Sequence, residues 1–544
     1  MSKFMKKIQS KIEKVLESNH GGNLPPSDVP PLAQPPSSRQ IYRFRKQRGV
    51  NLGSWFTLEN WLTPSLFQHA AEPKASEMDV LRGLGPQGAK TTLENHWAHF
   101  IDSGDWNWLV ERGINTVRIP VSYYHFLPGH PEPEVRQLMR GTEYESFADV
   151  YVNAWKYVVS NIQVAHEHKI GVLVDLHAAP GAQNTDSHSG LSGGKPGLWD
   201  SKEHQRRTVQ ILVAMAMEIV KYDNVVGLEL LNEPKNNNRL MSWYDEAIGA
   251  IRSSLGSQAQ ELPIYISDAW DTNWYCGTYI LQLQAKYVND HSNLGSFLVL
   301  DHHLYRCFTS QDQNKTASQH AGEVHPSNNG PSASMLADAS KETQGSIIIG
   351  EWSAALNPAS LASYPDHESK LAAQREWGHA QWEAYEQRCA GWFFWTLKKE
   401  GGSDRGWCYY TAVEQGVLPA QADRIKAAFV SGRHSIESLR AKGTMENQRA
   451  MQAHVRWWSE HSSNPNEFEH WRFEEGFRQG WGDCIVFFFG DLTEQLCGSE
   501  VGFVGQWKRL RTEGHRREKG NSMMVWEFEH GFEQAVGIFR GVLI

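Results

Sequence analysis

Between about residues 45 and 435, short apolar runs alternate with longer segments in which apolar residues recur at helical spacing. The short runs are rich in Val, Ile, Leu and aromatic residues, a composition typical of parallel strands that are buried on both faces. The runs that we interpret as strands are 49–52, 116–120, 171–176, 225–231, 263–267, 297–301, 346–350 and 391–395. Strand–helix units in this order predict an α/β fold, a (β/α)8 (TIM) barrel with long loop insertions.

Segments of different composition flank this pattern. Residues 1–20 place apolar residues at helical spacing, which predicts an amphipathic N-terminal helix that packs on the protein or makes weak contact with a membrane surface. Residues 21–44 are rich in Pro and Ser and predict an extended linker. We therefore expect the barrel to span residues 45–440 and an aromatic-rich C-terminal extension, packed on the barrel, to span residues 441–544.

Two regions interrupt or follow the alternating pattern. Residues 309–345 are polar and rich in Ser, Asn, Gln and Pro, and predict a long loop after the sixth strand. In the extension, the segment 471–479 is repeated at 526–534 with the same Trp, Phe, Glu, Gly, Phe and Gln. Aromatic residues at this density favour a packing unit, and a carbohydrate-binding appendage is the alternative.

Composition and charge narrow the class of protein. The chain has 544 residues, of which 40 % are hydrophobic, and a formal net charge of −9, which argues against nucleic acid as the main partner. No run of 18 apolar residues predicts a transmembrane helix, and no apolar core of a secretory signal follows the first residues, so we expect a cytoplasmic protein. The six cysteines show no metal-binding spacing and are expected to be free thiols.

Two glutamates carry the candidate chemistry. Glu233, within Asn232-Glu233-Pro234, and Glu351, within Gly350-Glu351-Trp352, each follow or end an apolar run. Strand ends of a parallel barrel share one face, where the active site lies. Two carboxylates on that face can hydrolyse a glycosidic bond, one as an acid and the other as a nucleophile or base. A strand-end glutamate that caps a helix or pairs with an arginine is the alternative interpretation for either one alone.

Together, these motifs resemble glycoside hydrolase family 5, and most closely its fungal exo-β-1,3-glucanase branch. The resemblance covers about residues 48 to 420, and the C-terminal extension resembles that of intracellular fungal members. It implies a retaining glycosidase that needs no metal or cofactor and acts on a β-glucan or another β-glucoside. The matching stretches are 48–55, 59–67, 113–120, 175–181, 232–234, 301–305, 350–352 and 394–396.

The resemblance also implies roles for individual residues. Glu233 corresponds to the general acid/base and Glu351 to the nucleophile. Asn232 is expected to hold the sugar 2-hydroxyl, a contact that strengthens in the transition state. Arg118 is expected to keep Glu351 ionised through charge-assisted hydrogen bonds, and Tyr305 to contact an oxygen of the nucleophile.

The remaining implied residues contact the substrate. His177 and His303 are expected to donate hydrogen bonds to substrate hydroxyls or to orient the carboxylates. Trp395 is expected to form the stacking floor under the sugar, Glu59 to bind outer hydroxyls of the terminal sugar, and Phe308 to form half of an aromatic clamp. A pocket closed at one end in this way implies an exo-acting enzyme.

The chain departs from the family pattern after its Leu-His motif. Asp186 stands where the family has the second aromatic of the clamp, and Ser187 and His188 stand where it has an Asp-Asn pair that grips the terminal glucose. An alternative with the same chemistry is therefore a β-glucosidase acting on a sterol, lipid or flavonoid glucoside. A non-catalytic glucan-binding protein is the alternative from a different class.

Overall fold

The computed structural model describes residues 35–193, 195–256, 262–280, 297–423, 435–462, 464, 467–489 and 499–543. The N-terminal helix predicted over residues 1–20 lies outside these residues, as does most of the predicted linker. The chain forms two compact units: one spans residues 47–277 and 297–422, and the other contains the remaining residues. The first unit ends well before the predicted barrel boundary at residue 440.

The first unit is built on a closed barrel of parallel strands in which chain order and spatial order agree. The barrel closes where β8 pairs with β1, with Gln47 opposite Gly391. This arrangement confirms the predicted α/β barrel class. The strands are β1 (Gln47–Asn51), β2 (Thr116–Ser122), β3 (Gly171–Ala178), β4 (Val225–Glu229), β5 (Ile264–Ser267), β6 (Leu298–Leu304), β7 (Ile347–Trp352) and β8 (Gly391–Phe394).

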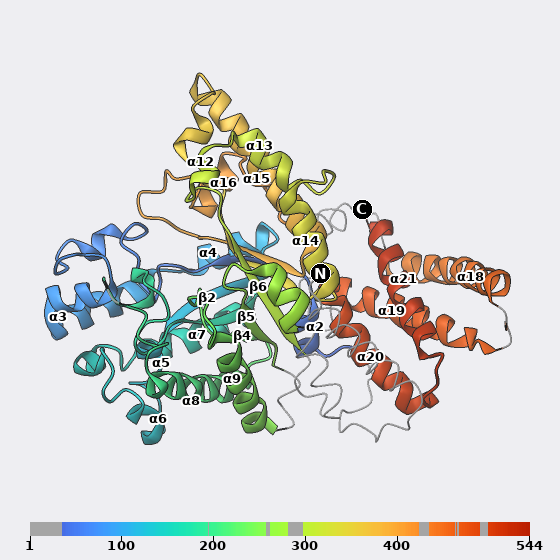
Figure 1. Cartoon of the computed structure of the whole chain (residues 1–544), viewed down its shortest axis with the longest axis horizontal. Coiled ribbons are helices and arrows are strands. Elements are labelled where there is room, and N and C mark those ends of the chain that lie inside the picture. Colours follow the sequence, from blue (N-terminus) through green and yellow to red (C-terminus); the bar gives the residue numbers. More distant parts are fainter. Residues whose placement is uncertain are drawn as a thin grey trace. The chain divides into compact units, whose positions relative to one another are not determined.

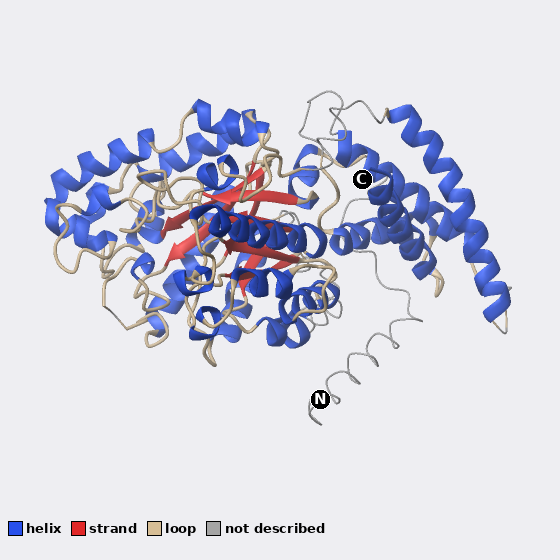
Figure 2. Cartoon of the chain, turned by 90° about the horizontal axis from the view of Figure 1, so that it is seen from above, coloured by secondary structure: helices blue, strands red, loops and turns tan. Residues whose placement is uncertain are grey.

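Every strand residue is buried, which explains why the strands read as continuous apolar runs in the sequence. Helices surround the strands and cover their outer side (Figure 2). Connecting helices are α3 (Glu77–His99), α4 (Ser103–Glu111), α5 (Tyr123–Phe126), α6 (Pro133–Gln137), α7 (Ala154–Glu167), α8 (Lys202–Ile219), α9 (Leu240–Leu255), α10 (Thr272–Trp274), α15 (His367–Arg388) and α16 (Tyr409–Glu414). Short 3-10 turns lie at Pro64–Phe67, Glu145–Val150, Ser187–Ser189 and Pro358–Leu361, and a π-helical turn at Tyr275–Ile280.

The segment 309–345 is helical, and its prediction as a loop is wrong. It contains α12 (Ser310–Gln313), α13 (Ala317–Val324) and α14 (Pro331–Glu342). Thr309 and Thr316 form capping boxes that start the first two helices, and a proline at its first turn starts the third. One face of α13 and one face of α14 are buried, so a few small apolar residues suffice to hold a largely polar segment in place.

The second unit is helical (Figure 1). Its helices are α2 (Ser38–Phe44), α18 (Ile436–His461), α19 (His470–Phe489), α20 (Val504–Lys519) and α21 (Val525–Leu543). The extended linker predicted over residues 21–44 is therefore wrong for its last seven residues, because Ser37 and Gln40 form a capping box and Ile41 and Phe44 are buried.

The repeated sequence segments lie at the crossing of α19 and α21. A Cβ atom on Gly476 would lie 2.0 Å from the carbonyl oxygen of Phe528, and a Cβ on Gly531 would lie 2.0 Å from that of Phe473. The glycine of each repeat therefore allows the backbone of the other repeat to approach closely. The contact gives the duplication a packing role, as the sequence favoured.

Two further sequence expectations concern the described residues. The five cysteines among them are free thiols. None of the helices in these ranges has the length and hydropathy needed to cross a membrane.

Candidate active site

Arg118 is a fully buried guanidinium in β2, and each of its five N–H groups meets an acceptor. These contacts fix the guanidinium from several strands at once and leave it no freedom to rotate. The surrounding carboxylates outweigh the effect of burial and raise the pKa of Arg118 well above its ordinary value. The acceptors are Glu229 at 2.7 Å, Glu351 at 2.9 Å, Asn232 at 2.9 Å, Asn51 at 3.0 Å and Asp175 at 3.1 Å.

The two predicted glutamates meet beside this arginine. Glu351 lies within β7, and Glu233 lies four residues after the end of β4. One oxygen of each carboxylate and one nitrogen of His303 all lie within 4.8 Å of one another. Glu233 has a φ of +43°, a left-handed backbone conformation that costs a glutamate about 1–2 kcal/mol. The fold therefore holds the backbone of Glu233 in a strained conformation, with its side chain next to that of Glu351.

A shift in strand register places Glu351. The pairing of β7 with β8 is irregular between Ile349 and Trp352, so the side chains there do not follow simple alternation. Gly350 fills this irregular part because a Cβ atom there would lie 2.1 Å from a carboxylate oxygen of Asp301. The backbone N–H of Gly350 instead donates to Asp301 at 2.7 Å.

His303 and Tyr305 contact the two glutamates from β6 and the residue after it. Nδ1 of His303 lies 2.8 Å from Oε1 of Glu233 and 3.5 Å from Oε2 of Glu351. The hydroxyl of Tyr305 donates to Oε2 of Glu351 at 2.7 Å. Burial alone would lower the pKa of His303, but the charges of Glu351 and Asp301 raise it well above its ordinary value. The raised pKa therefore favours the positively charged form of His303, with a proton on both ring nitrogens.

The two glutamates differ in their electrostatic surroundings. Burial raises the pKa of Glu351, although His303 and Arg118 favour its carboxylate form. Burial also opposes ionisation of Glu233, but the hydrogen bond and charge of His303, together with His188, hold its pKa below the ordinary value. In the protein without substrate, the proton nearest to Glu233 is thus the one on His303.

His177 is a neutral histidine next to the stacking floor. Its Nδ1 donates to Oδ2 of Asp175 at 2.6 Å, and burial lowers the pKa of His177 well below its ordinary value. Its ring lies parallel to that of Trp395, with 5.8 Å between the ring centroids and 10° between the planes. Gly53 allows Trp395 to lie close to the backbone, because a Cβ atom there would be 2.7 Å from the indole.

Three buried carboxylates of the barrel were missed by sequence reasoning. Burial raises the pKa of Asp175 to about 7 and that of Asp301 to about 6, and it also raises the pKa of Glu229. All three are fully buried. The sequence signal for them is an acidic residue inside an apolar run. Burying such a residue costs free energy unless it is paired, so its presence indicates a partner.

A cavity of about 1110 Å³ opens onto the glutamates. Glu59 lies in its wall and accepts a hydrogen bond from the indole of Trp61 at 2.8 Å, and burial raises the pKa of Glu59 to about 7. Phe308 and Trp270 also line the cavity and are 67 % and 55 % exposed. The wall thus combines a few polar groups with exposed aromatic faces, as sugar-binding and ligand-binding pockets do.

Two of the residues that depart from the family pattern, Asp186 and His188, form a chain of contacts that ends at Glu233, the candidate acid/base. Nε2 of His188 lies 3.5 Å from Glu233 and 3.7 Å from Asp186, and its Nδ1 lies 3.2 Å from His177. Burial lowers the pKa of His188, but Asp186, Glu233 and Glu59 outweigh it and raise the pKa to about 9. His188 is therefore a positive charge beside Glu233, a contact that the sequence did not predict.

Replacement of His188 by asparagine is expected to move the basic limb of the pH profile of kcat/KM to higher pH. The positive charge of His188 lowers the pKa of Glu233, so its loss lets Glu233 keep a proton at higher pH. The profile is measured from pH 4 to 10 with an aryl β-glucoside, and the exposed His99→Asn serves as the control. A basic limb that stays in place or moves to lower pH contradicts the assignment.

All ten predicted site residues lie in the barrel unit, and Arg118, Asn232, Glu233, His303, Tyr305 and Glu351 form one connected network of hydrogen bonds and ion pairs. Glu59, His177, Phe308 and Trp395 line the same cavity. Glu233, His303 and Glu351 are also close enough to share a cation, but donors in the protein already satisfy both carboxylates. The arrangement is suited to acid–base and nucleophilic chemistry at a single bond.

Comparisons with known proteins agree with this geometry. Residues 84–401, more than half of the chain, match the family described as Cellulase (glycosyl hydrolase family 5). Residues 439–543 match a second description, Glucan 1,3-beta-glucosidase 3 C-terminal domain.

The proteins to which the chain is similar include curated relatives and solved structures. Glucan 1,3-beta-glucosidase 3 of Schizosaccharomyces pombe is 29 % identical over 511 residues, which cover 92 % of this chain and 96 % of that protein. Glucan 1,3-beta-glucosidase of Blumeria graminis is 28 % identical over 438 residues, which cover 73 % of this chain and 92 % of that protein. The rutinosidase of Aspergillus niger shares the fold, with a TM-score of 0.51 and 19 % identity over 69 % of this chain and 99 % of its own.

Proposed function

Because the chain belongs to glycosyl hydrolase family 5 and is therefore a glycosidase, we propose that it is a retaining β-glucosidase that releases glucose from the non-reducing ends of β-1,3-glucan. The observation that carries this proposal is the distance between the two carboxylates, whose nearest oxygens lie within 4.8 Å. Retaining glycosidases have carboxyl groups about 5–5.5 Å apart, whereas inverting ones leave about 6.5–9.5 Å for a water molecule. The names of the two relatives support β-1,3-glucan as the substrate.

In the proposed reaction, Glu351 attacks the anomeric carbon and forms a glycosyl-enzyme. Arg118 and Tyr305 each donate to one of its oxygens, which stabilises the ionised form and aims the carboxylate. Water then attacks the same carbon from the side of the departed group, and two inversions give net retention.

Glu233 gives the leaving oxygen its proton and later takes one from water. The proton comes to Glu233 through the 2.8 Å hydrogen bond from His303, whose raised pKa keeps it protonated. The pair of His303 and Glu233 thus acts as one acid. Because the same pair recovers the proton from water in the second step, no metal or cofactor enters the proposed reaction.

Asn232 and Trp395 position the sugar in this scheme. Arg118 donates to Oδ1 of Asn232 at 2.9 Å, and the amide N–H₂ lies 3.4 Å from His177 and 3.3 Å from His188, two residues that line the cavity; from there it is proposed to donate to the 2-hydroxyl. Trp395 presents its indole as the floor of the cavity, and Glu59 accepts from outer hydroxyls of the same sugar. These contacts involve the terminal sugar alone, which supports exo action.

A second candidate function keeps the chemistry and changes the group that leaves. Trp270, Phe308 and Met335 line the cavity, and Asp186 stands where an aromatic partner for Phe308 is expected. This apolar side suits a sterol, lipid or flavonoid aglycone as well as a second sugar.

The two candidates are separated by comparing laminaritriose, p-nitrophenyl β-glucoside and a steryl β-glucoside as substrates. Rapid release of glucose from laminaritriose, with the β anomer formed first by NMR, supports the main proposal. Preferential cleavage of the steryl glucoside moves the function to the second candidate. Initial release of the α anomer contradicts the retaining mechanism.

Replacement of Phe308 by alanine is expected to raise KM for laminaritriose about fivefold and leave KM for p-nitrophenyl β-glucoside within a factor of two. An exposed aromatic face that stacks on a second sugar contributes about 1 kcal/mol, and the aryl glucoside extends less far along the cavity. Steady-state kinetics on both substrates check this result. Equal changes for both would place Phe308 outside the site for the leaving sugar.

A further inference from the structure

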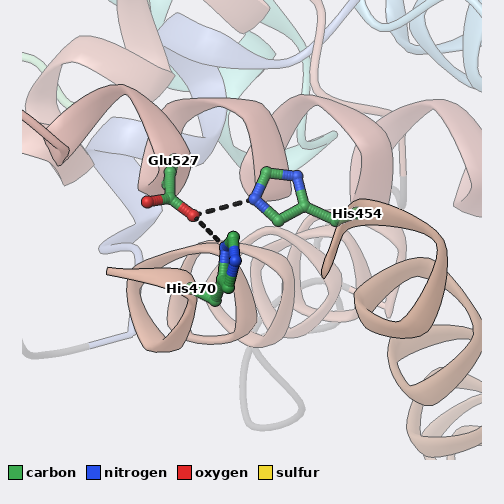
Figure 3. A group of neighbouring side chains, drawn as sticks. All are labelled: His454, His470 and Glu527. Carbon is green, nitrogen blue, oxygen red and sulfur yellow. Dashed lines mark hydrogen bonds and ion pairs between the residues drawn. The ribbon is translucent and has the colours of Figure 1, made fainter. Parts of the chain in front are cut away.

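Three side chains from three helices meet in the second unit, which contains none of the residues assigned to hydrolysis (Figure 3). His454 lies in α18, His470 begins α19, and Glu527 lies in the first turn of α21. Nε2 of His454 and Nδ1 of His470 each lie 2.8 Å from the same oxygen, Oε2 of Glu527. The three atoms lie within 4.8 Å of one another.

Neighbouring contacts hold the three groups in this arrangement. The other oxygen of Glu527, Oε1, accepts a hydrogen bond from the backbone N–H of Glu469 at 2.7 Å. The ring of His454 stacks on Phe473, with 4.1 Å between centroids and 19° between planes, and the ring of His470 is parallel to Phe468. In metal sites, contacts of this kind orient the side chains that bind the ion, because they fix the carboxylate and the planes of the imidazole rings.

The group contains a buried anion without a permanent cation. Glu527 is fully buried, and its ion pairs within the described part of the chain are those with His454 and His470. A buried carboxylate requires a counter-charge, which here is either a proton on one imidazole or an ion bound by all three groups. Both imidazole nitrogens already point at the oxygen that such an ion would share.

The duplicated segment provides an internal comparison. In the aligned repeats, Arg472 stands at the position of Glu527, and its guanidinium lies 2.7 Å from Nε2 of His515. His515 stacks on Phe528 as His454 stacks on Phe473, with 4.3 Å between centroids. Around the first repeat's Arg472, the positive charge thus belongs to a side chain. At the corresponding position of the second repeat stands the carboxylate Glu527, which has two histidines beside it, His454 and His470.

We propose that His454, His470 and Glu527 bind one divalent transition-metal ion, Zn²⁺ by the chemistry of the ligands, and that the ion ties α18, α19 and α21 together. Two imidazoles and one carboxylate are a common ligand set for zinc, with bonds of about 2.0–2.2 Å and tetrahedral angles. The three ligand atoms would then lie about 3.3 Å apart, so the 2.8 Å contacts open by about 0.5 Å. His470 is 20 % exposed and leaves a path for water as the fourth ligand.

The test uses the intact chain, freed of metal with a chelator. Zn²⁺ is titrated in competition with a chromophoric chelator, and Co²⁺ is titrated by visible absorption, which reports four-coordinate geometry. We expect one site with a Kd below about 1 μM, and a loss of affinity of at least about 100-fold in Glu527→Gln and in His470→Asn. His461→Asn, an exposed histidine at the end of α18, is the matched control and is expected to bind as the unchanged chain does.

Amide hydrogen exchange provides the second readout. Zn²⁺ is expected to slow exchange in α18, α19 and α21 of the unchanged chain and not in His470→Asn, whose partly exposed side chain makes unfolding of the variant a small risk. Absence of Zn²⁺ binding by the unchanged chain overturns the proposal and leaves an imidazolium as the counter-charge. Binding of equal strength in both ligand variants places the ion elsewhere and overturns it as well.

Discussion

Replacement of Glu351 by glutamine is expected to lower kcat for glycoside hydrolysis by about 10⁴-fold or more. Glutamine has nearly the same shape and can still accept a hydrogen bond from Arg118, but it cannot form the glycosyl ester. The loss should therefore appear in kcat, with the fold unchanged by circular dichroism. Glu376→Gln, an exposed glutamate on α15, is the matched control.

Azide separates the roles of the two glutamates. In Glu351→Ala, azide can occupy the vacated side of the sugar and displace an activated leaving group once, which gives an α-glycosyl azide. In Glu233→Ala, azide can attack the glycosyl-enzyme and give the β-glycosyl azide. The reverse pattern of products would exchange the two roles, and activity of Glu351→Gln within tenfold of the unchanged protein would remove Glu351 from the mechanism.

Replacement of Gly531 by alanine is expected to destabilise the pair of α19 and α21 by about 3 kcal/mol or more. The added Cβ would lie 2.0 Å from the carbonyl oxygen of Phe473, a backbone atom that can move only if the helices separate. Hydrogen exchange in both helices should therefore speed up, and limited proteolysis should cut the segment 467–543 sooner.

Gly537→Ala is the matched control for this substitution. It lies six residues further along α21, where an added Cβ meets no atom within 4 Å. Alanine in an open helical position stabilises by about 0.5–1 kcal/mol relative to glycine, so exchange should slow slightly. Equal effects of the two substitutions would mean that the crossing does not depend on the repeated glycine.

The barrel was predictable because its strands are buried on both faces. Runs such as 171–176 and 346–350 contain almost no polar residues, and each lies within two residues of the observed limits of β3 and β7. The segment 309–345 was wrongly predicted as a loop because its composition is mostly polar. Its helices are short, largely polar and stabilised by caps at Thr309 and Thr316, which weigh little against a loop-like composition.

The site residues were predictable where the family resemblance implied a role, and unpredictable where the role follows only from contacts in the folded barrel. Glu233 and Glu351 stand in motifs that resemble a known family, and the common face of a parallel barrel predicts that they meet. Glu229 lies outside the matching stretches, and Asp175, which begins one of them, received no role from the resemblance. The importance of both follows from the contacts of Arg118, which depend on the closed barrel. The group around Glu527 was hidden because its histidines lie 57 and 73 residues away along the chain.

The five contacts of Arg118 have a consequence for the order in which the protein is made. Arg118 precedes Glu351 by 233 residues, and β1 cannot pair with β8 until residue 391 exists. A growing chain that has reached only β4 already contains Asp175 and Glu229, and its guanidinium can pair with them while the place of the nucleophile is empty. Hydrolysis can therefore begin only when translation has passed most of the barrel, because a ribosome-bound fragment that stops short of β7 lacks both the nucleophile Glu351 and the cavity residue Trp395.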